Sequence, residues 1–211
     1  MTAVQFRYVK PLLAIALVRT LLAQATPPQL LLAVPPIPPL NTPFGGVVVL
    51  DVAMDSAGTV RNISTVAGAS PFLKPSVDSV RRWKFTSAVD LSKKFVVSAV
   101  FLYRPRQIFS SGPGIYLSQV PPASNQPPLP EFISDAPYPV NSIAEGVVIL
   151  ELKIGANGQI EQIRTVHDVP ALTDAAGQAV AAWKFSSART RGKAVEGISI
   201  AVISFLRPVI H

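Results

Sequence analysis

Chemically reactive side chains are sparse in this sequence of 211 residues. It has no cysteine and two histidines, His167 and the terminal His211, so a thiolate site is excluded and a histidine-based metal site lacks ligands. No zincin motif, phosphate-binding glycine loop, dinucleotide fingerprint or Gly-x-Ser-x-Gly nucleophile motif occurs. His167 and Asp168 are adjacent in sequence, but no further residues with the spacing of metal ligands accompany them. The sequence therefore predicts no metal ion and no cofactor.

Two carboxylates at matching positions are the remaining candidates for chemistry. Asp51 and Glu151 are spaced by 100 residues, and general acid–base catalysis requires such groups to converge on one substrate. Each lies in a run that alternates apolar and polar residues, and the alternation predicts that both carboxylates face solvent. We therefore expect no catalytic residue and a protein that is not an enzyme.

The spacing of 100 residues recurs through much of the chain. Residues 46–88 and 146–188 align without a gap and are identical at 14 of 43 positions. Both segments contain the phrase Trp-Lys-Phe, which begins at Trp83 and at Trp183 and holds the only two tryptophans. The sequence thus predicts one domain type that occurs twice in tandem.

Each copy has the pattern of a β-β-α-β unit, because alternating apolar residues, a glycine turn and apolar residues at helical spacing follow one another. The elements predicted for the first copy are strands at 48–54 and 59–67, a helix at 75–83 and a strand at 96–103. Those predicted for the second copy are strands at 147–154 and 159–167, a helix at 172–183 and a strand at 198–206. The predicted fold class is α+β, with each copy a small antiparallel sheet covered by one helix.

A few residues of the repeat are expected to be structural. The aromatic residues of the repeated phrase should hold helix to sheet, and the turn glycines tolerate positive φ. The expected structural residues are Trp83, Phe85, Trp183, Phe185, Gly58 and Gly158. Domains this small bury modest cores, so we expect the two copies to pack against each other or against a partner.

Residues 1–25 have the pattern of an export signal. Arg7 and Lys10 precede an apolar run at 11–25 that ends in Ala-x-Ala. The alternative is a marginal, uncleaved membrane anchor, because the run is shorter than the roughly 20 residues of a spanning helix and contains Arg19. Both alternatives predict an exported protein of the periplasm or cell envelope, and the uncleaved form would be anchored in the inner membrane.

Proline is concentrated in two segments at the borders of the repeat. Such composition is typical of extended, semi-rigid spacers without a packed core. The predicted organisation is a signal or anchor at 1–25, a spacer at 26–43, a first domain at 44–106, a linker at 107–134 and a second domain at 135–211.

The net charge of +7 lies in the N-terminal half of the chain. Residues 41–106 carry nine Lys or Arg and four Asp or Glu, whereas residues 135–211 are neutral. The positive residues are scattered, and no nucleic-acid-binding motif accompanies them. The sequence therefore predicts no nucleic-acid partner.

The repeated elements resemble the TonB C-terminal domain family. The resemblance rests on a glycine before the first strand, a glycine turn, the Trp-Lys-Phe phrase at the end of the helix and a β-rich last strand. The second copy adds Tyr138-Pro139, and the first adds Arg81-Arg82 before its tryptophan. The first copy lacks the leading Tyr-Pro and short helix of the family. The resemblance implies two tandem domains similar to those of TonB energy transducers.

By this resemblance, such domains bind a segment of an outer-membrane receptor as a strand added to the edge of their sheet. The mode is physically sound, because an edge strand offers unpaired N–H and C=O groups. The candidate partner-binding residues are Tyr138, Pro139, Ile198, Ile200, Val202 and Ser204 in the second copy and Val96, Ser98 and Val100 in the first. The implied role is TonB-type energy transduction to outer-membrane transport, with inner-membrane motor proteins as further partners. Tyr138-Pro139 has the alternative role of starting a helix.

The sequence leaves a second function open. The last strands of the two copies could pair with each other, which would give a structural or adaptor protein of the envelope that binds no receptor. A firm membrane anchor at 11–25 and a free last strand favour the transducer. Mutual pairing of the last strands favours the adaptor.

Overall fold

The computed structural model describes residues 28–87, 95–107, 114–117 and 121–208. The predicted signal or anchor at 1–25 lies outside the described residues. Within the described part of the chain, no helix combines the length and the apolar character that crossing a bilayer requires.

Strands dominate the described residues, which also contain two helices. The strands are β1 (Leu30–Leu32), β2 (Gly46–Met54), β3 (Val60–Ala67), β4 (Lys84–Phe85), β5 (Phe95–Tyr103), β6 (Ile115–Tyr116), β7 (Pro130–Ile133), β8 (Gly146–Ile154), β9 (Ile160–His167), β10 (Lys184–Phe185), β11 (Ala188–Thr190), β12 (Lys193–Val195) and β13 (Gly197–Phe205). The helices are α1 (Leu73–Val80) and α2 (Pro170–Ala181). The predicted order of strands and helix occurs in the first half of the chain, up to residue 107, and again in the second half.

A tight turn closes the hairpin of β2 and β3, and another closes that of β8 and β9. Gly58 has a φ of +74° and Gly158 a φ of +79°, a left-handed conformation that other residues adopt only at a cost. A Cβ atom on Gly58 would lie 2.1 Å from the carbonyl oxygen of Phe85, and one on Gly158 would lie 2.4 Å from that of Phe185. Glycine therefore lets each turn close onto the short strand that follows the helix.

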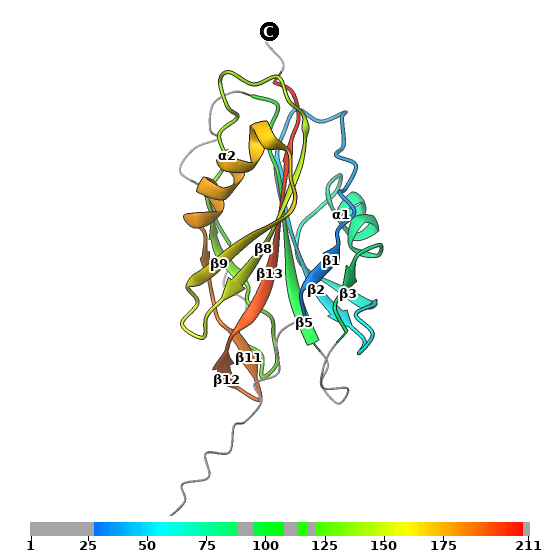
Figure 1. Cartoon of the computed structure of the whole chain (residues 1–211), viewed down its shortest axis with the longest axis vertical. Coiled ribbons are helices and arrows are strands. Elements are labelled where there is room, and N and C mark those ends of the chain that lie inside the picture. Colours follow the sequence, from blue (N-terminus) through cyan, green and yellow to red (C-terminus); the bar gives the residue numbers. More distant parts are fainter. Residues whose placement is uncertain (1–27, 88–94, 108–113, 118–120, 209–211) are drawn as a thin grey trace, which may run out of the picture.

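A six-stranded sheet forms the centre of the molecule, in place of the two separate small sheets that the sequence predicts. Its strand order is β3-β2-β5-β13-β8-β9. Neighbouring strands are antiparallel except for β5 and β13, which pair in parallel (Figure 1). The composition of β13 explains its central position, because the strand has no charged residue and is buried along its whole length.

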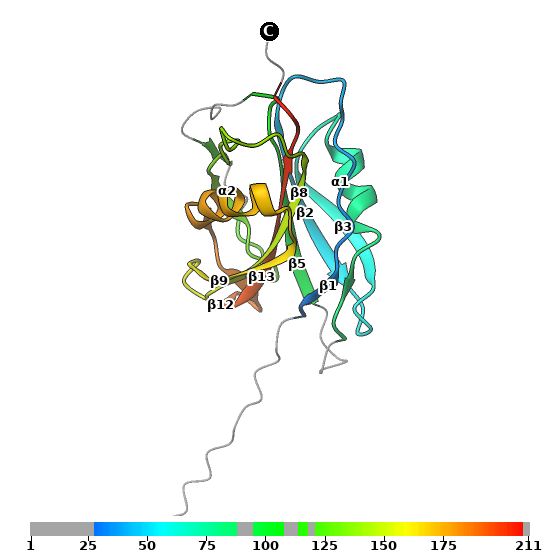
Figure 2. The same cartoon turned by 45° about the horizontal axis from the view of Figure 1, so that its top comes forward.

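The parallel pairing determines where the helices lie. Because β5 and β13 are equivalent strands that run in the same direction, the two halves are related by a rotation about an axis along the strands. Such a rotation exchanges the two faces of the sheet. Accordingly, α1 covers one face and α2 covers the opposite face (Figure 2).

The described parts of both proline-rich segments contribute residues to the cores, so the prediction of spacers without a packed core is wrong for these parts. We call residues 28–45 the first arm and residues 128–145 the second arm. In the first arm β1 pairs with β4, and in the second β7 pairs with β10. The reason lies in the apolar residues between the prolines, since Leu30 and Ile133 are each 1% exposed.

The arms also bind the tryptophans. The indole Nε1 of Trp83 donates a hydrogen bond to the carbonyl of Val34 at 3.2 Å, and Nε1 of Trp183 donates to that of Ser134 at 2.9 Å. The repeat therefore extends into both arms at the same spacing of 100 residues. In each arm a turn, and no helix, precedes the first long strand. The first half thus has a counterpart of the leading segment that its sequence seemed to lack.

Each face of the sheet has its own core, and both halves contribute to each. The core under α2 includes Val49, Val100 and Leu102 from the first half. The core under α1 includes Ile149, Ile200 and Val202 from the second half. The predicted structural aromatic residues are core residues, with Trp83, Phe85, Trp183 and Phe185 between 0% and 5% exposed. The expectation that the copies pack against each other is confirmed.

Candidate protein-binding surfaces

The seven strand residues predicted to contact a partner do not lie at a free edge. They are Val96, Ser98 and Val100 in β5 and Ile198, Ile200, Val202 and Ser204 in β13. Strand β5 is paired with β2 on one side and β13 on the other, and β13 is paired with β5 and β8. The buried hydroxyl of Ser98 donates to that of Ser199 at 2.8 Å across the junction. A partner cannot add a strand where each half already supplies one to the other.

Tyr138 is also inaccessible. Its side chain is 3% exposed, and its hydroxyl donates a hydrogen bond to the carbonyl of Ala144 at 2.7 Å. The residue therefore fixes the fold of the second arm from inside the core. Pro139 is half-buried, and its carbonyl accepts a hydrogen bond from the N–H of Ser142 in a turn. The predicted helix start at Tyr138-Pro139 is thus a turn.

The free edges of the sheet are the outer sides of β3 and β9. Both strands have eight residues, and each has one sheet neighbour within the described part of the chain. The equivalent Thr65 and Thr165 are exposed at the two edges. Main-chain groups on the outer side of such strands are open to pairing with another strand. These edges could not be identified from the sequence, because strand order depends on the pairing of β5 with β13.

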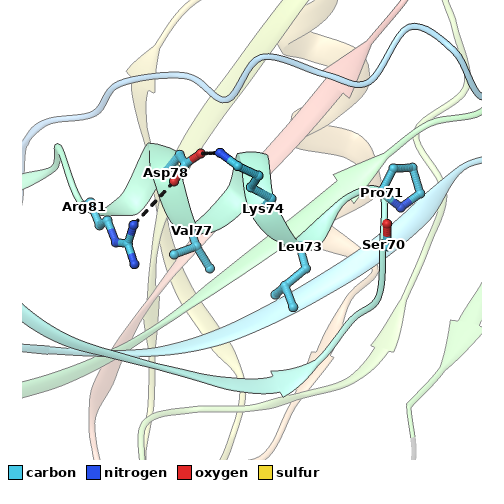
Figure 3. Close-up of a pocket in the computed structure, with 7 residues that line it drawn as sticks. All are labelled: Ser70, Pro71, Leu73, Lys74, Val77, Asp78 and Arg81. Atoms are coloured by element: carbon cyan, nitrogen blue, oxygen red, sulfur yellow. Dashed lines mark hydrogen bonds and ion pairs between the residues drawn. The ribbon is translucent and has the colours of Figure 1, made fainter.

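The surroundings of the two edges differ. A hollow of about 420 Å³ lies along one side of α1, and its residues are drawn in Figure 3. They are Ser70, Pro71, Leu73, Lys74, Val77, Asp78 and Arg81. Lys74 and Arg81 both pair with Asp78, at 2.5 Å and 3.6 Å. These ion pairs border an apolar strip of Leu73 and Val77.

The equivalent side of α2 has no such strip. Thr173 replaces Leu73, and Gly177 replaces Val77. A Cβ atom on Gly177 would have no atom within 4 Å, so this side of α2 is open. Asp174 replaces Lys74, which reverses the charge at that position.

Glu151 holds the first arm in place. Its carboxylate accepts a hydrogen bond from the N–H of Leu30 at 2.6 Å and pairs with the guanidinium of Arg164 at 2.8 Å. Arg164 also donates to the carbonyl of Leu30 at 3.0 Å. Glu151 is 6% exposed, so the prediction of a solvent-facing carboxylate is wrong here. The first arm covers the face of the sheet that the strand pattern alone assigned to water.

The matching positions of the other half lack this ionic attachment. They hold Asp51, Ser64 and Pro130 in place of Glu151, Arg164 and Leu30. Pro130 has no N–H to donate, and Ser64 carries no positive charge. Asp51 is half-buried, and burial raises the pKa of its carboxyl above the ordinary value. The second arm has a different ion pair, between Asp135 and the buried guanidinium of Arg104 at 3.3 Å, together with apolar contacts such as those of buried Ile133.

The described residues give no support for a metal or acid–base site. Among them, no group of three or more His, Asp or Glu side chains is close enough to hold a metal ion. His167 Nδ1 contacts the carbonyl of Val147 at 2.7 Å, and Asp168 accepts a hydrogen bond from the hydroxyl of Thr173. Both residues are thus engaged in local structure at the end of β9.

Comparison with known families gives one match. Residues 138–205 match the family described as the C-terminal of Gram-negative bacterial TonB protein. No curated protein and no solved structure shows significant similarity to the chain. The matched residues run from the second arm to the end of β13, so they include β8, β9 and α2. Residues 138–205 are therefore a TonB C-terminal-like domain.

Proposed function

From the membership of residues 138–205 in the TonB C-terminal family, we propose that this chain is an envelope protein that captures an extended segment of a protein partner by strand addition. The addition takes place at an outer edge of the six-stranded sheet, on β3 or β9. The proposal rests on these two eight-residue edge strands. The pairing of β5 with β13 occupies the other edge of each half. Main-chain hydrogen bonds would supply affinity and alternate side chains selectivity.

The test is photo-crosslinking in the native envelope. A photoreactive residue is placed at Thr65 or at Thr165, with Lys193 in the β11–β12 hairpin as a position away from both edges. The crosslinked partner is identified, and amide hydrogen exchange is measured on the complex of the full chain with that partner. Strand addition predicts slower exchange in β3 or β9. A partner that slows exchange in neither edge strand would exclude strand addition.

A second function has its own support. The mutual pairing of the last strands is the feature expected of a structural or adaptor protein whose two halves serve each other and which binds no receptor. This function predicts that neither edge position crosslinks to a partner. It also predicts that substitutions on the outer sides of β3 and β9 leave the function of the protein unchanged.

Energy transduction is the finer form of the first function. It requires residues 11–25 to hold the chain in the inner membrane, so that a captured receptor segment can be pulled. The N-terminal residue and the membrane fraction of the native protein decide this. A periplasmic protein that starts at Thr26 excludes transduction, because a released chain cannot transmit force. An inner-membrane protein that retains Met1 supports it.

A further inference from the structure

The two edges of the sheet are not equivalent, and the difference indicates the kind of partner. We propose that the partner segment is acidic and lies along β3, with apolar residues at alternate positions that enter the hollow beside α1. This inference rests on the proposed function, since it specifies the edge and the chemistry of the captured strand. It concerns the first half of the chain, which lies outside the matched TonB C-terminal residues.

The contacts of α1 indicate where the hollow lies relative to the β3 edge. On one flank of α1, the hydroxyl of Ser76 contacts that of Tyr103 in β5 at 2.9 Å, and Ser79 donates to the carbonyl of Val34 in the first arm. That flank therefore faces the centre of the sheet. Leu73 and Val77 line the hollow on the other flank. Within the described residues β3 is the outermost strand on the side of the first half, so we place this flank toward β3. A strand added to β3 would run beside this flank.

The hollow beside α1 has an apolar lining. Leu73, Val77 and Ile63 of β3 are partly buried and pack around the same core under α1. In Figure 3 the side chains of Leu73 and Val77 point from one side of α1, and the paired Lys74 and Asp78 lie on the other side of the helix. The hollow of about 420 Å³ is wide enough for several apolar side chains. Every second side chain of an added strand points to this face of the sheet, so alternate apolar residues would fill the space.

The segments that contain α1 and α2 differ in net charge. Residues 73–82 contain Lys74, Arg81 and Arg82 against Asp78, a net charge of +2, whereas residues 173–182 contain only Asp174, a net charge of −1. The Lys74 side chain is 86% exposed and that of Arg81 68% exposed, so both reach solvent at the border of the hollow. Complementary charge favours acidic partners and repels basic ones.

Segments of this protein itself do not fit the site. Residues 1–27 carry Arg7, Lys10 and Arg19 and no acidic residue. A second copy would place one positively charged α1 flank near another if two β3 edges paired. The chain as a whole carries a net charge of +7, which adds to that repulsion. The charge pattern thus points to a different, acidic protein.

The experiment uses synthetic ten-residue peptides as probes and the full chain as the receptor. One peptide alternates valine with glutamate, a second alternates valine with lysine, and a third alternates valine with glutamine. Affinity is measured by fluorescence anisotropy at low and high salt, and amide hydrogen exchange locates the bound peptide. We expect the glutamate peptide to bind at least tenfold more tightly than the lysine peptide and to slow amide exchange in β3. The affinity of the glutamate peptide should fall as the salt concentration rises.

Paired variants test the two features of the hollow separately. Removal of the rim charges by Lys74→Gln with Arg81→Gln should weaken binding of the glutamate peptide about tenfold. The matched control, Lys184→Gln with Lys193→Gln, removes the same charge from exposed positions in the second half and should leave affinity unchanged. Val77→Ser should weaken binding about fivefold through lost apolar contact, whereas Gly177→Ser at the equivalent position of α2 should have no effect.

The outcomes separate this inference from the function on which it rests. Equal binding of the three peptides, slowed exchange in β9 instead of β3, or absence of binding by the glutamate peptide each overturns the acidic β3 site. The function itself stands if the crosslinked native partner slows exchange in β9. Both fail if that partner slows exchange in neither edge strand.

Discussion

The two halves of this molecule share one plan but attach their arms through different polar contacts. In both halves an arm crosses a face of the sheet, pairs with the short strand after the helix and accepts a hydrogen bond from the tryptophan. The first arm is attached through the buried Glu151 and its partner Arg164. The matching positions of the other half hold Asp51 in the sheet and Pro130 in the second arm, and Pro130 has no N–H to donate. In the second arm Asp135 pairs instead with the buried Arg104 at 3.3 Å, and apolar contacts add to this attachment.

The difference between the two arm attachments shows which parts of the repeat are constrained by packing. The tryptophan, the turn glycine and the long strands are set by a common core, so their positions coincide at a spacing of 100 residues. The polar groups beneath the arms and along the helices are free to diverge. They have diverged in charge at α1 and α2, so the halves offer different surfaces at their outer edges.

The largest expected effect tests whether the two halves form one cooperative unit. Trp83→Ala and Trp183→Ala should each lower the free energy of unfolding by about 3–5 kcal/mol, because each removes a buried ring. Both cores contain residues of both halves, so each variant should shift one common transition in urea, followed by circular dichroism. Two separable transitions, with each variant moving only one, would contradict the shared cores.

The next effect concerns the two turn glycines. Gly58→Ala and Gly158→Ala should each cost at least about 1–2 kcal/mol for the left-handed φ alone. Gly58→Ala should cost more, because its Cβ would meet three backbone atoms within 3 Å, whereas that of Gly158 would meet one. The measurement is the urea midpoint of each variant.

A third glycine provides the control for this pair. Gly177 lies within α2 with no neighbour near its missing Cβ, so Gly177→Ala should stabilise the protein by about 0.5–1 kcal/mol. Equal losses for Gly58→Ala and Gly158→Ala would show that the close contact around Gly58 relaxes at little cost.

The elements of the fold could be predicted from the sequence because their signals are local. Residues 198–206 have the β-rich composition of a strand, and β13 covers Gly197–Phe205. The predicted helix at 172–183 corresponds to α2 at Pro170–Ala181. Alternation, turn glycines and helical spacing each act within about ten residues, so a single sequence reports them.

The arrangement of the elements could not be predicted, because it depends on contacts far apart in sequence. The pairing of β5 with β13 joins residues about 100 apart, and no local pattern specifies it. The same holds for Glu151, whose partner Leu30 lies 121 residues away. The strand pattern assigned this carboxylate to solvent, since it contains no sign of the arm that covers it.

Proline content misled the prediction in a different way. Residues 26–43 and 107–134 were predicted to be spacers from composition, yet each contributes a buried strand residue to the core. An extended chain that bridges the sheet needs few internal hydrogen bonds, and proline supplies that conformation. Alignment of the two arms at the repeat spacing was the signal that could have revealed their equivalence.

The attachment of the first arm gives an expected effect similar in size to that of the turn glycines. Glu151→Gln should lower the free energy of unfolding by about 1.5–3 kcal/mol, because a charge-assisted hydrogen bond to Leu30 and the ion pair with Arg164 are weakened. Amide exchange at Leu30 should become faster in this variant, whereas exchange in the second arm should not change. If Glu151→Gln leaves both the stability and the exchange at Leu30 unaltered, the apolar contacts of the first arm hold it without this ionic attachment.

Substitution of Asp51, the carboxylate that matches Glu151, has the smallest expected effect. It should raise the free energy of unfolding at neutral pH, whereas Glu151→Gln lowers it. Burial raises the pKa of Asp51, so the folded protein holds that proton more tightly than the unfolded chain does. Its ionisation therefore destabilises the fold as pH rises from the ordinary carboxyl pKa through the raised value. Asp51→Asn removes this cost without changing the shape of the side chain.

Below the pKa values of Asp51 in the folded and unfolded chain, Asp51→Asn and the original protein should have the same free energy of unfolding. At neutral pH the variant should be the more stable of the two. Urea denaturation at pH 3 and pH 7 measures the difference. Asp51 faces Ser64 and Ser98 on the neighbouring strands, and neither carries a charge that could reverse the sign. A loss of stability at neutral pH in Asp51→Asn would instead mean that the ionised carboxylate holds the second arm, which would make the two attachments alike.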